Sequence, residues 1–313
     1  MPDSTIKYSI IVLLEEQHEG FAQFIQNLHE PFSSRDESFE ILIIANGTGG
    51  FLRNELARLQ SCNDKVKAFE LNTKTTQAVC LKAGLKESSG EIIVVCGSYQ
   101  QITNNSFRQL FDALDDETDI ISAWRQNRVD PAFNQFQSKM FNTLVRWVTR
   151  VDLHDLNCTL KIFRREVLEE TELYGNMYRF LPILAARNGF KTKEVKSVHY
   201  QEQGRTGFYS ISEYVNRVID IFTLYFNTRF TRKPLRFFSS IGLGFLLTGV
   251  LITSYLFMRR IFMDYPIGDR PILLLATFFT VLGVQAASVG LLGEVLAFTN
   301  GRHRKGYTIE KEI

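Results

Sequence analysis

Two long apolar stretches near the end of the printed sequence limit most strongly what this chain can fold into. The first, FFSSIGLGFLLTGVLITSYLFM at 237–258, has no charged residue over 22 positions, and the second, at 271–298, has one, Glu294. At a rise of about 1.5 Å per residue, a helix of this length crosses a hydrocarbon core about 30 Å thick. Both stretches are therefore predicted to span a membrane. A pair of helices buried in a soluble protein is the alternative.

The linker between the two spans predicts a transmembrane hairpin over 237–298. It is short, contains Pro266 and Gly268, and carries fewer basic residues than the outer ends of the spans. Basic residues favour the cytoplasmic side, so both termini are expected there, with a cytoplasmic tail at 299–313. Glu294 is expected at interfacial depth. Glycines and alanines recur at intervals of three and four residues, which favours close helix contact, within the hairpin or between chains.

The region before the spans alternates short apolar runs with stretches of helical spacing. Such alternation predicts an α/β fold with a mostly parallel sheet that is covered on both faces. Ligands of such sheets bind beyond the carboxyl ends of the strands. The predicted strands lie at 8–14, 39–45, 66–71, 91–96 and 119–123, and the loops after the first four lie at 14–18, 45–50, 72–76 and 96–103.

Two amphipathic segments follow this region. Residues 138–150 place apolar side chains on one helical face, and a second helix is expected within 206–236, directly before the first span. An apolar stripe at that place suits the lipid headgroup layer, and it equally suits docking on the α/β domain at 1–205.

The composition argues against several classes of function. The net charge is +2, and basic and aromatic residues are not interleaved as in nucleic-acid-binding proteins. The four cysteines form no CxxC pair and the five histidines are scattered, so neither a zinc site nor a disulfide framework is predicted. The start, MPDSTIKYSII, lacks the features of a signal peptide, so the first half is expected in the cytosol with reduced thiols.

Several motifs, in order, resemble a known family. They are DIISAWRQNRVDP at 119–131, LHDLNCTLKIFRREVLEE at 153–170 and YRFLPILAARNGFKTKEV at 178–195, followed by the apolar hairpin. Together they resemble the polyprenyl-phosphate glycosyltransferases of family 2, such as dolichol-phosphate mannose synthase and the bacterial undecaprenyl-phosphate glucosyltransferases. The resemblance covers nearly the whole chain. It implies a GT-A (Rossmann-like) domain at the cytoplasmic face of the cell membrane, where a lipid phosphate attacks a nucleotide-sugar.

The resemblance also implies roles on the acceptor side of the site. Arg125 and Arg128 occupy the turn in which the family places a phosphate-contacting arginine, and a guanidinium can hold phosphate oxygens as a bidentate fork. Ser138 matches a serine that contacts the acceptor phosphate, and Arg205 lies in the loop that closes on the phosphates. Asp155 matches an acid that orients or activates the acceptor, and it is the catalytic candidate. A surface or capping role is the alternative for each.

The donor side departs from the family pattern. The family's fourth strand ends in two aspartates that hold Mg²⁺ or Mn²⁺, and the ion neutralises charge on the leaving nucleoside diphosphate. Here the corresponding positions read Gly97, Ser98 and Tyr99, and the acids after the second strand are replaced by Ala45 and Asn46. None of these side chains is an anion at neutral pH, so no metal ligand is predicted among them.

A retained fold with altered donor loops favours a membrane-bound, catalytically impaired pseudo-glycosyltransferase that acts as a subunit or regulator in glycolipid or glycan assembly. Such a protein uses no cofactor and associates with membrane lipid or polyprenyl phosphate. It forms a homo-oligomer, or a hetero-oligomer with an active glycosyltransferase or another glycan enzyme. One alternative is an active transferase that moves a hexose to polyprenyl phosphate with non-standard donor and metal binding, using Mg²⁺ or Mn²⁺. A polyprenyl-phosphate-binding protein without transfer chemistry is another.

Overall fold

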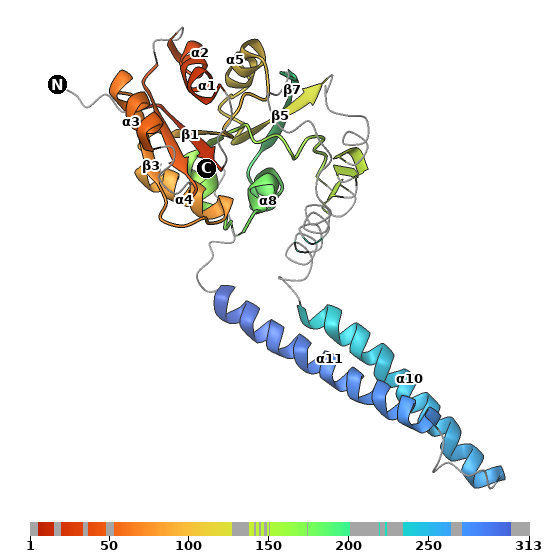
Figure 1. The fold of residues 1–313 in the computed structure, drawn as a ribbon. Coiled ribbons are helices and arrows are strands. Elements are labelled where there is room, and N and C mark those ends of the chain that lie inside the picture. Colours follow the sequence, from red (N-terminus) through yellow and green to blue (C-terminus); the bar gives the residue numbers. More distant parts are fainter. Residues whose placement is uncertain are drawn as a thin grey trace. The chain divides into compact units, whose positions relative to one another are not determined.

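The chain forms two compact units in a computed structural model, one made of Met1–Ile221 with Tyr307–Ile313 and the other of Phe222–Gly306 (Figure 1). The structure describes residues 6–15, 20–33, 37–47, 53–126, 138–200 without 141, 144, 147, 148, 150 and 174, then 219, 223, 234–263 and 271–301. The juxtamembrane helix expected within 206–236 lies almost wholly outside the described residues. The domain boundaries stay a prediction.

The first unit is built on a seven-stranded mixed sheet in the order β3-β2-β1-β4-β6-β5-β7. The strands are β1 (Tyr8–Leu14), β2 (Phe39–Ala45), β3 (Val66–Glu70), β4 (Ile92–Cys96), β5 (Ile120–Gln126), β6 (Lys161–Arg164) and β7 (Thr192–Val198). β6 runs antiparallel to its neighbours β4 and β5, and all other pairs are parallel. The five predicted strands and the mostly parallel sheet are confirmed, and β6 and β7 are additional.

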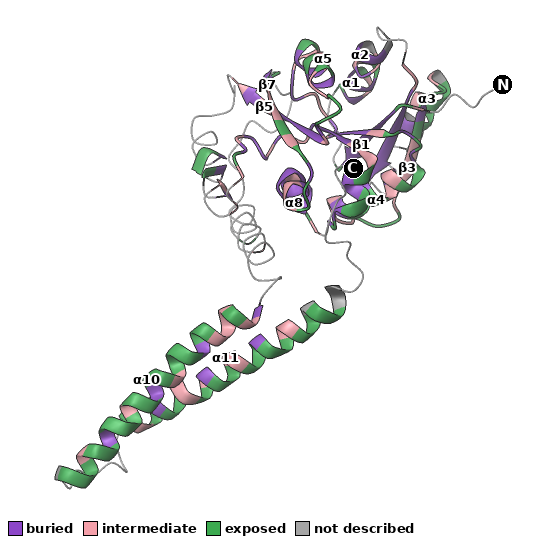
Figure 2. Ribbon diagram, turned by 180° about the vertical axis from the view of Figure 1, so that it is seen from behind, coloured by how far each residue is buried: buried purple, intermediate pink, exposed green. Residues whose placement is uncertain are grey.

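Helices cover both faces of this sheet, as the alternating pattern predicts (Figures 1 and 2). The helices are α1 (Phe21–Asn27), α2 (Glu30–Ser33), α3 (Arg53–Cys62), α4 (Gln77–Glu87), α5 (Asn104–Asp112), α7 (Arg165–Glu170) and α8 (Leu181–Arg187), with a 3-10 turn η1 at Met177–Phe180. Aromatic residues of α1, α2 and α5 share one apolar core with the side chains of Tyr8, Ile10 and Val12. On the other face, Gly84 of α4 lies against Ile11. The described residues of 138–149 are also helical.

Because β1, β2, β4 and β5 run in one direction, their carboxyl ends meet at one edge of the sheet, and this edge carries the loops in which ligand contacts are expected. The loops are packed closely. Gly47, after β2, has a φ of +62°, and a Cβ there would collide with the backbone of Lys74 in the loop after β3. Gly47 therefore permits both the left-handed turn and the close approach of the two loops.

The second unit is a pair of long apolar helices, α10 (Pro234–Met263) and α11 (Pro271–Gly301). Both are long and apolar enough to cross a membrane. Figure 2 shows that most of their surface is exposed, unlike the buried strands of the first unit. The two helices predicted from 237–258 and 271–298 are thus confirmed, and α10 extends beyond its predicted span at both ends.

Glycines bring α10 and α11 into direct contact. A Cβ at Gly242 would lie 2.7 Å from the carbonyl oxygen of Gly283, and a Cβ at Gly283 would lie 2.7 Å from that of Gly242. Gly249 makes a similar approach to the Ala276 carbonyl oxygen. Gly244 differs, because nothing lies within 4 Å of its Cβ position. The sequence left open whether the glycines contact a helix of the same hairpin or of another chain. In the structure, Gly242, Gly249 and Gly283 make their contacts within the hairpin.

Glu294 has a role in the hairpin that the sequence did not predict. Its Oε2 accepts a hydrogen bond of 3.3 Å from the backbone N–H of Leu235, in the first turn of α10. The first N–H groups of a helix lack partners within the helix, and a carboxylate is favourable there because of the helix dipole. Glu294 therefore fixes the end of α11 against the start of α10.

We expect a Gly283→Leu variant to force the two helices apart, because its side chain would occupy the space of the Gly242 carbonyl and Leu246. Overpacking of this kind costs about 1–3 kcal/mol. The measurement is the distance between spin labels at Leu247 and Val281 in nanodiscs, with Gly244→Leu as the matched control. A Gly283→Leu distance equal to that of the control would show that the glycine contact does not hold the helices together.

Candidate functional site

The loop after β4, where the family's aspartates are expected, is held by neutral side chains. The side-chain oxygen of Gln101 accepts hydrogen bonds from the backbone N–H (2.9 Å) and the hydroxyl (2.8 Å) of Thr159. Thr159 lies two residues before the start of β6. The Gln101 amide nitrogen donates to the Tyr99 hydroxyl at 3.2 Å. A Cβ at Gly97 would lie 3.2 Å from the Thr159 hydroxyl, and Ser98 is buried. The loop is thus closed onto the start of β6.

The end of β2 is held in the same manner. The side-chain oxygen of Asn46 accepts the backbone N–H of Thr75 at 2.7 Å, and its amide nitrogen donates to the Thr75 carbonyl at 2.9 Å. The carbonyl oxygen of Ala45 accepts from Leu71 at 2.9 Å. Asn46 is buried and acts as a link between the loops after β2 and β3.

These residues do not fit the Mg²⁺ or Mn²⁺ that the resemblance implies. Hard divalent cations take anionic and carbonyl oxygens. Gly97, Ser98 and Tyr99 offer no carboxylate, and the amide oxygens of Asn46 and Gln101 already accept hydrogen bonds from the protein. Among the residues that the structure describes, no group of three or more His, Cys, Asp or Glu side chains could hold a metal ion.

A pocket that is partly open to solvent lies beside the loop after β4. No lining side chain is charged, and the walls are mainly apolar. The lining residues come from α1 and the residue after it, α2, the end of β4 and the loop that follows, α5 and the segment before β6. They are Phe24, Asn27, Leu28, Pro31, Cys96, Tyr99, Gln100, Gln101, Ile102, Asn104, Phe107, Thr159 and Leu160.

On the acceptor side, Arg125 and Asp155 form a buried ion pair. The Arg125 Nε donates to Asp155 Oδ2 at 2.7 Å and its Nη2 donates to Oδ1 at 3.2 Å, while the Arg125 backbone N–H also reaches Oδ2 at 3.3 Å. Both side chains are 4% exposed. The structure brings together two residues that were predicted to have separate roles. Asp155 occupies one side of the Arg125 guanidinium, so a phosphate would have to bind the remaining N–H groups or displace the carboxylate. Both roles stay predictions.

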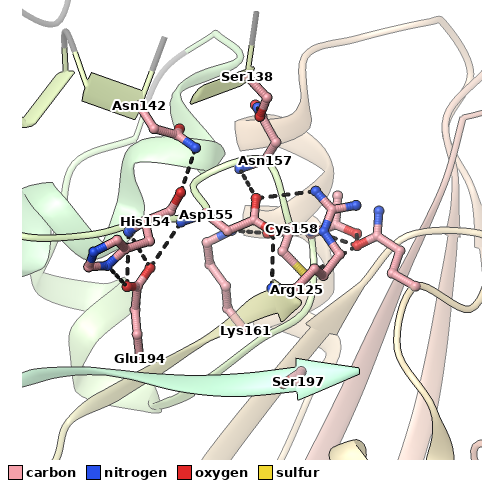
Figure 3. A network of polar contacts seen from close by, with 12 residues as sticks. Arg125, Ser138, Asn142, His154, Asp155, Asn157, Cys158, Lys161, Glu194 and Ser197 are labelled. Carbon is pink, nitrogen blue, oxygen red and sulfur yellow. Dashed lines mark hydrogen bonds and ion pairs between the residues drawn. The ribbon is translucent and has the colours of Figure 1, made fainter. Parts of the chain in front are cut away.

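The turn that carries Asp155 is fixed from β7 by Glu194, which the sequence analysis missed (Figure 3). Its carboxylate accepts the backbone N–H of His154 at 2.8 Å and that of Asp155 at 3.1 Å. The His154 ring lies 2.9 Å from Glu194 through Nδ1 and stacks on Trp124 with ring centroids 4.1 Å apart. Nothing in the sequence around Glu194 distinguishes it from other charged residues of an edge strand.

Ser138 joins the same network. Its hydroxyl accepts a hydrogen bond of 3.1 Å from Asn157 Nδ2, and the Asn157 backbone N–H donates to Asp155 at 3.2 Å. Asn142, one turn after Ser138, donates to the His154 carbonyl at 2.6 Å. Three of the five predicted acceptor residues are therefore connected, as Figure 3 shows. Arg128 and Arg205 lie outside the described residues.

Lys161, at the start of β6, is a further residue that the sequence analysis missed. Its side chain is fully buried. The ammonium donates to the Cys158 carbonyl at 2.5 Å and lies 4.7 Å from the centroid of the Tyr178 ring. Burial lowers the pKa of Lys161 to about 8, because a charged group is disfavoured away from water. The Tyr178 hydroxyl donates to the Thr159 carbonyl at 2.6 Å.

The sheet order, with its antiparallel β6 and with candidate ligand-binding loops at one edge, is that of a GT-A glycosyltransferase domain. The chain belongs to the Glycosyl transferase family 2, which its residues 10–171 match. With its two apolar helices, it is a membrane-associated protein of the polyprenyl-phosphate glycosyltransferase type.

The chain is similar to two named relatives over nearly its whole length. It is 25% identical to the dodecaprenyl-phosphate galacturonate synthase of Rhizobium johnstonii, over 95% of this chain and 90% of the relative. It is 27% identical to the undecaprenyl-phosphate 4-deoxy-4-formamido-L-arabinose transferase of Pseudomonas syringae, over 97% of this chain and 90% of the relative. Both names specify a polyprenyl phosphate.

A solved structure shows the same fold. The glucosyl-3-phosphoglycerate synthase of Mycobacterium tuberculosis, in complex with Mn²⁺, uridine diphosphate and phosphoglyceric acid, superposes with a TM-score of 0.54. The match covers 71% of this chain and 78% of that chain at 9% sequence identity. At this identity the likeness establishes the fold alone.

Proposed function

We propose that this protein is a pseudo-glycosyltransferase of the polyprenyl-phosphate type, a non-catalytic subunit or regulator in glycolipid assembly. Its GT-A domain lies at the cytoplasmic face of the membrane, and both termini are cytoplasmic. The reason is that the outer ends of the hairpin carry more basic residues than the linker between the two helices. The ligand class is polyprenyl phosphate, which the names of the two relatives specify. The protein assembles with itself or with an active glycan enzyme.

This proposal is supported by the hydrogen bonds that the loops after β2 and β4 make within the protein. Transfer from a nucleotide-sugar needs positive charge at the leaving diphosphate, and the family supplies it with a metal on carboxylates. Here Gln101 and Asn46 are turned toward protein donors, and Thr159 lies against Gly97. A metal-nucleotide complex would have to displace these bonds, and Gly97, Ser98 and Tyr99 offer no carboxylate in their place.

An active transferase with non-standard donor binding is the second candidate. Two observations favour it. The relatives that align over 95% and 97% of this chain carry the names of a synthase and a transferase. On the acceptor side, Arg125, Ser138 and Asp155 lie in one connected network.

Calorimetry on the full chain in nanodiscs separates the two candidates. We expect UDP- and GDP-sugars to bind no better with Mn²⁺ than with EDTA, because no carboxylate is present at Gly97–Tyr99 to hold the ion. A parallel assay follows radiolabelled sugar into undecaprenyl phosphate, with the Pseudomonas syringae relative in the same nanodiscs as the positive control. We expect transfer by the relative and none by this chain.

Three results decide the matter. Metal-dependent donor binding, or transfer that EDTA abolishes, would overturn the pseudo-glycosyltransferase proposal. Transfer that persists in EDTA would establish the second candidate. Absence of transfer, together with a glycan enzyme that copurifies with the chain from the native membrane, would support the proposed subunit role.

A further inference from the structure

The pocket beside the loop after β4 takes no part in the proposed function. It is lined from α1, α2 and α5, from the end of β4 with its loop, and from the segment before β6. Neither Arg125 nor Asp155 lines it, and the described residues after β2 and β3 do not line it either. The pocket is therefore separate from the acceptor network, and it shares with the donor side only the loop after β4 and the segment before β6.

The walls of the pocket favour a small uncharged ligand. Phe24, Leu28 and Phe107 are buried apolar residues that line it, and the described lining residues include no charged side chain. A charged ligand would lose water there without gaining an ion pair, whereas apolar surface gains free energy by leaving water. The empty space is about 390 Å³, part of it open to solvent, near the lower end of the range of about 300–1,000 Å³ for small-molecule sites. This space suits a molecule of about one ring.

Gln100 offers such a ligand a hydrogen-bond acceptor. Its side-chain nitrogen donates to the Ile102 carbonyl at 3.0 Å and to Asn104 Oδ1 at 2.7 Å. Because a backbone carbonyl oxygen can only accept, the bond to Ile102 fixes which end of the Gln100 amide is the nitrogen. The side-chain oxygen of Gln100 makes no hydrogen bond to any residue that the structure describes. A ligand with an O–H or N–H group would supply the missing donor.

We propose that this pocket binds an uncharged, mainly apolar small molecule of about one ring that carries an O–H or N–H donor, and that Gln100 accepts the hydrogen bond from it. The inference goes beyond the proposed function and does not depend on it. A molecule bound here contacts Tyr99 and Gln101, which belong to the loop that closes onto Thr159. Binding therefore favours the closed arrangement of this loop, because a ligand stabilises the conformation that it binds.

The test is ¹⁹F NMR on the full chain in nanodiscs, with 4-fluorophenol, 4-fluorotoluene and 4-fluorobenzoate as probes. We expect the wild type to bind 4-fluorophenol at least about tenfold more tightly than 4-fluorobenzoate, whose carboxylate would be buried without a cation. Asn27→Phe, which fills the pocket from α1, should lose the binding of 4-fluorophenol. Partition of a probe into lipid is the same in every sample, so a difference between variants reports the pocket.

Gln23→Phe is the matched control for this variant. Gln23 is exposed, lies one turn earlier in α1 and does not line the pocket. Either substitution removes the hydrogen bond between Gln23 and Asn27, so the two variants differ in whether the new ring enters the pocket. Binding of 4-fluorophenol by Gln23→Phe should stay within about twofold of wild type, since its lining is unchanged.

The role of Gln100 is tested by the ratio of two affinities. Gln100→Leu keeps the approximate size of the side chain without its acceptor. It should shift the ratio of 4-fluorophenol to 4-fluorotoluene affinity by about three- to tenfold in favour of 4-fluorotoluene, the usual effect of one hydrogen bond. Gln109→Leu, at an exposed position of α5 outside the pocket, should leave the ratio unchanged. A change in pocket shape that weakens both probes equally cancels in this ratio.

Any of three outcomes would refute the inference. These are equal binding of 4-fluorophenol by Asn27→Phe and Gln23→Phe, binding of 4-fluorobenzoate as tight as that of 4-fluorophenol, and an affinity ratio that Gln100→Leu leaves unchanged. If Gln100→Leu does not fold, Gln100→Met, which also lacks the amide oxygen, must show the same shift. Sugar transfer by the chain would end the pseudo-glycosyltransferase proposal and leave the inference about the pocket standing.

Discussion

Replacing Asp155 with asparagine is expected to lower the free energy of unfolding by about 3–5 kcal/mol, the usual cost of removing one partner of a buried ion pair. The reason is that Arg125, only 4% exposed, would keep its charge without the Asp155 carboxylate. The measurement is urea unfolding of the detergent-solubilised full chain, followed by tryptophan fluorescence, since Trp124 stacks on the neighbouring His154.

The chain offers a matched control for this variant. Arg146 and Asp152 form an ion pair at 3.3 Å whose side chains are 33% and 81% exposed, and Asp152→Asn should cost no more than about 1 kcal/mol. An Asp155→Asn variant as stable as this control would mean that Arg125 finds other partners when Asp155 is lost. Asp155 would then be free to serve an acceptor without a structural penalty.

Replacing Lys161 with methionine is expected to remove a rise in stability at alkaline pH. The pKa of Lys161 is about 8 in the folded protein and 10.5 in its ordinary state. Below pH 8 both the folded and the unfolded chain hold the proton. Between pH 8 and 10.5 the unfolded chain holds more protons, so the folded state gains stability as the pH rises. The lowered pKa corresponds to a gain of about 3 kcal/mol in the free energy of unfolding between pH 8 and 10.5.

The difference in the free energy of unfolding between the wild type and Lys161→Met separates the titration of Lys161 from that of other groups. Urea unfolding from pH 7 to 10.5 should show that the wild type gains stability relative to Lys161→Met by about 3 kcal/mol. At pH 7 the variant should be at least as stable as wild type, because it buries no charge. Parallel curves for the two proteins would show that the Lys161 pKa is not lowered by burial.

The parts of the fold that sequence could predict are those with local patterns. β1, β2, β3, β4 and β5 read as short apolar runs, and the two hairpin helices read as uncharged stretches of membrane-spanning length. β6 and β7 escape such a reading. In β6 a lysine opens a strand of only four residues, and β7 is an edge strand in which two lysines and a glutamate interrupt any apolar pattern. Their places follow from pairing with distant strands, which is not a local property.

The site divides in the same way. The absence of acidic residues at Gly97, Ser98 and Tyr99 could be seen in the sequence, because these positions are consecutive. The pairing of Arg125 with Asp155 was not, because 30 residues separate them and the contact depends on how the turn before β6 meets β5. Lys161 was not identified because a lysine is ordinarily a surface residue, and burial emerges only when the strands assemble.

The position of the Thr159 side chain beside Gly97 also bears on how this protein can change over evolutionary time. A carboxylate introduced at Gly97 by a single mutation would arrive against the Thr159 hydroxyl, which donates to Gln101. Such a change would be accommodated only if the Thr159 side chain shifted. Substitutions at positions 97 and 159 are therefore expected to depend on one another as the sequence of this chain diverges.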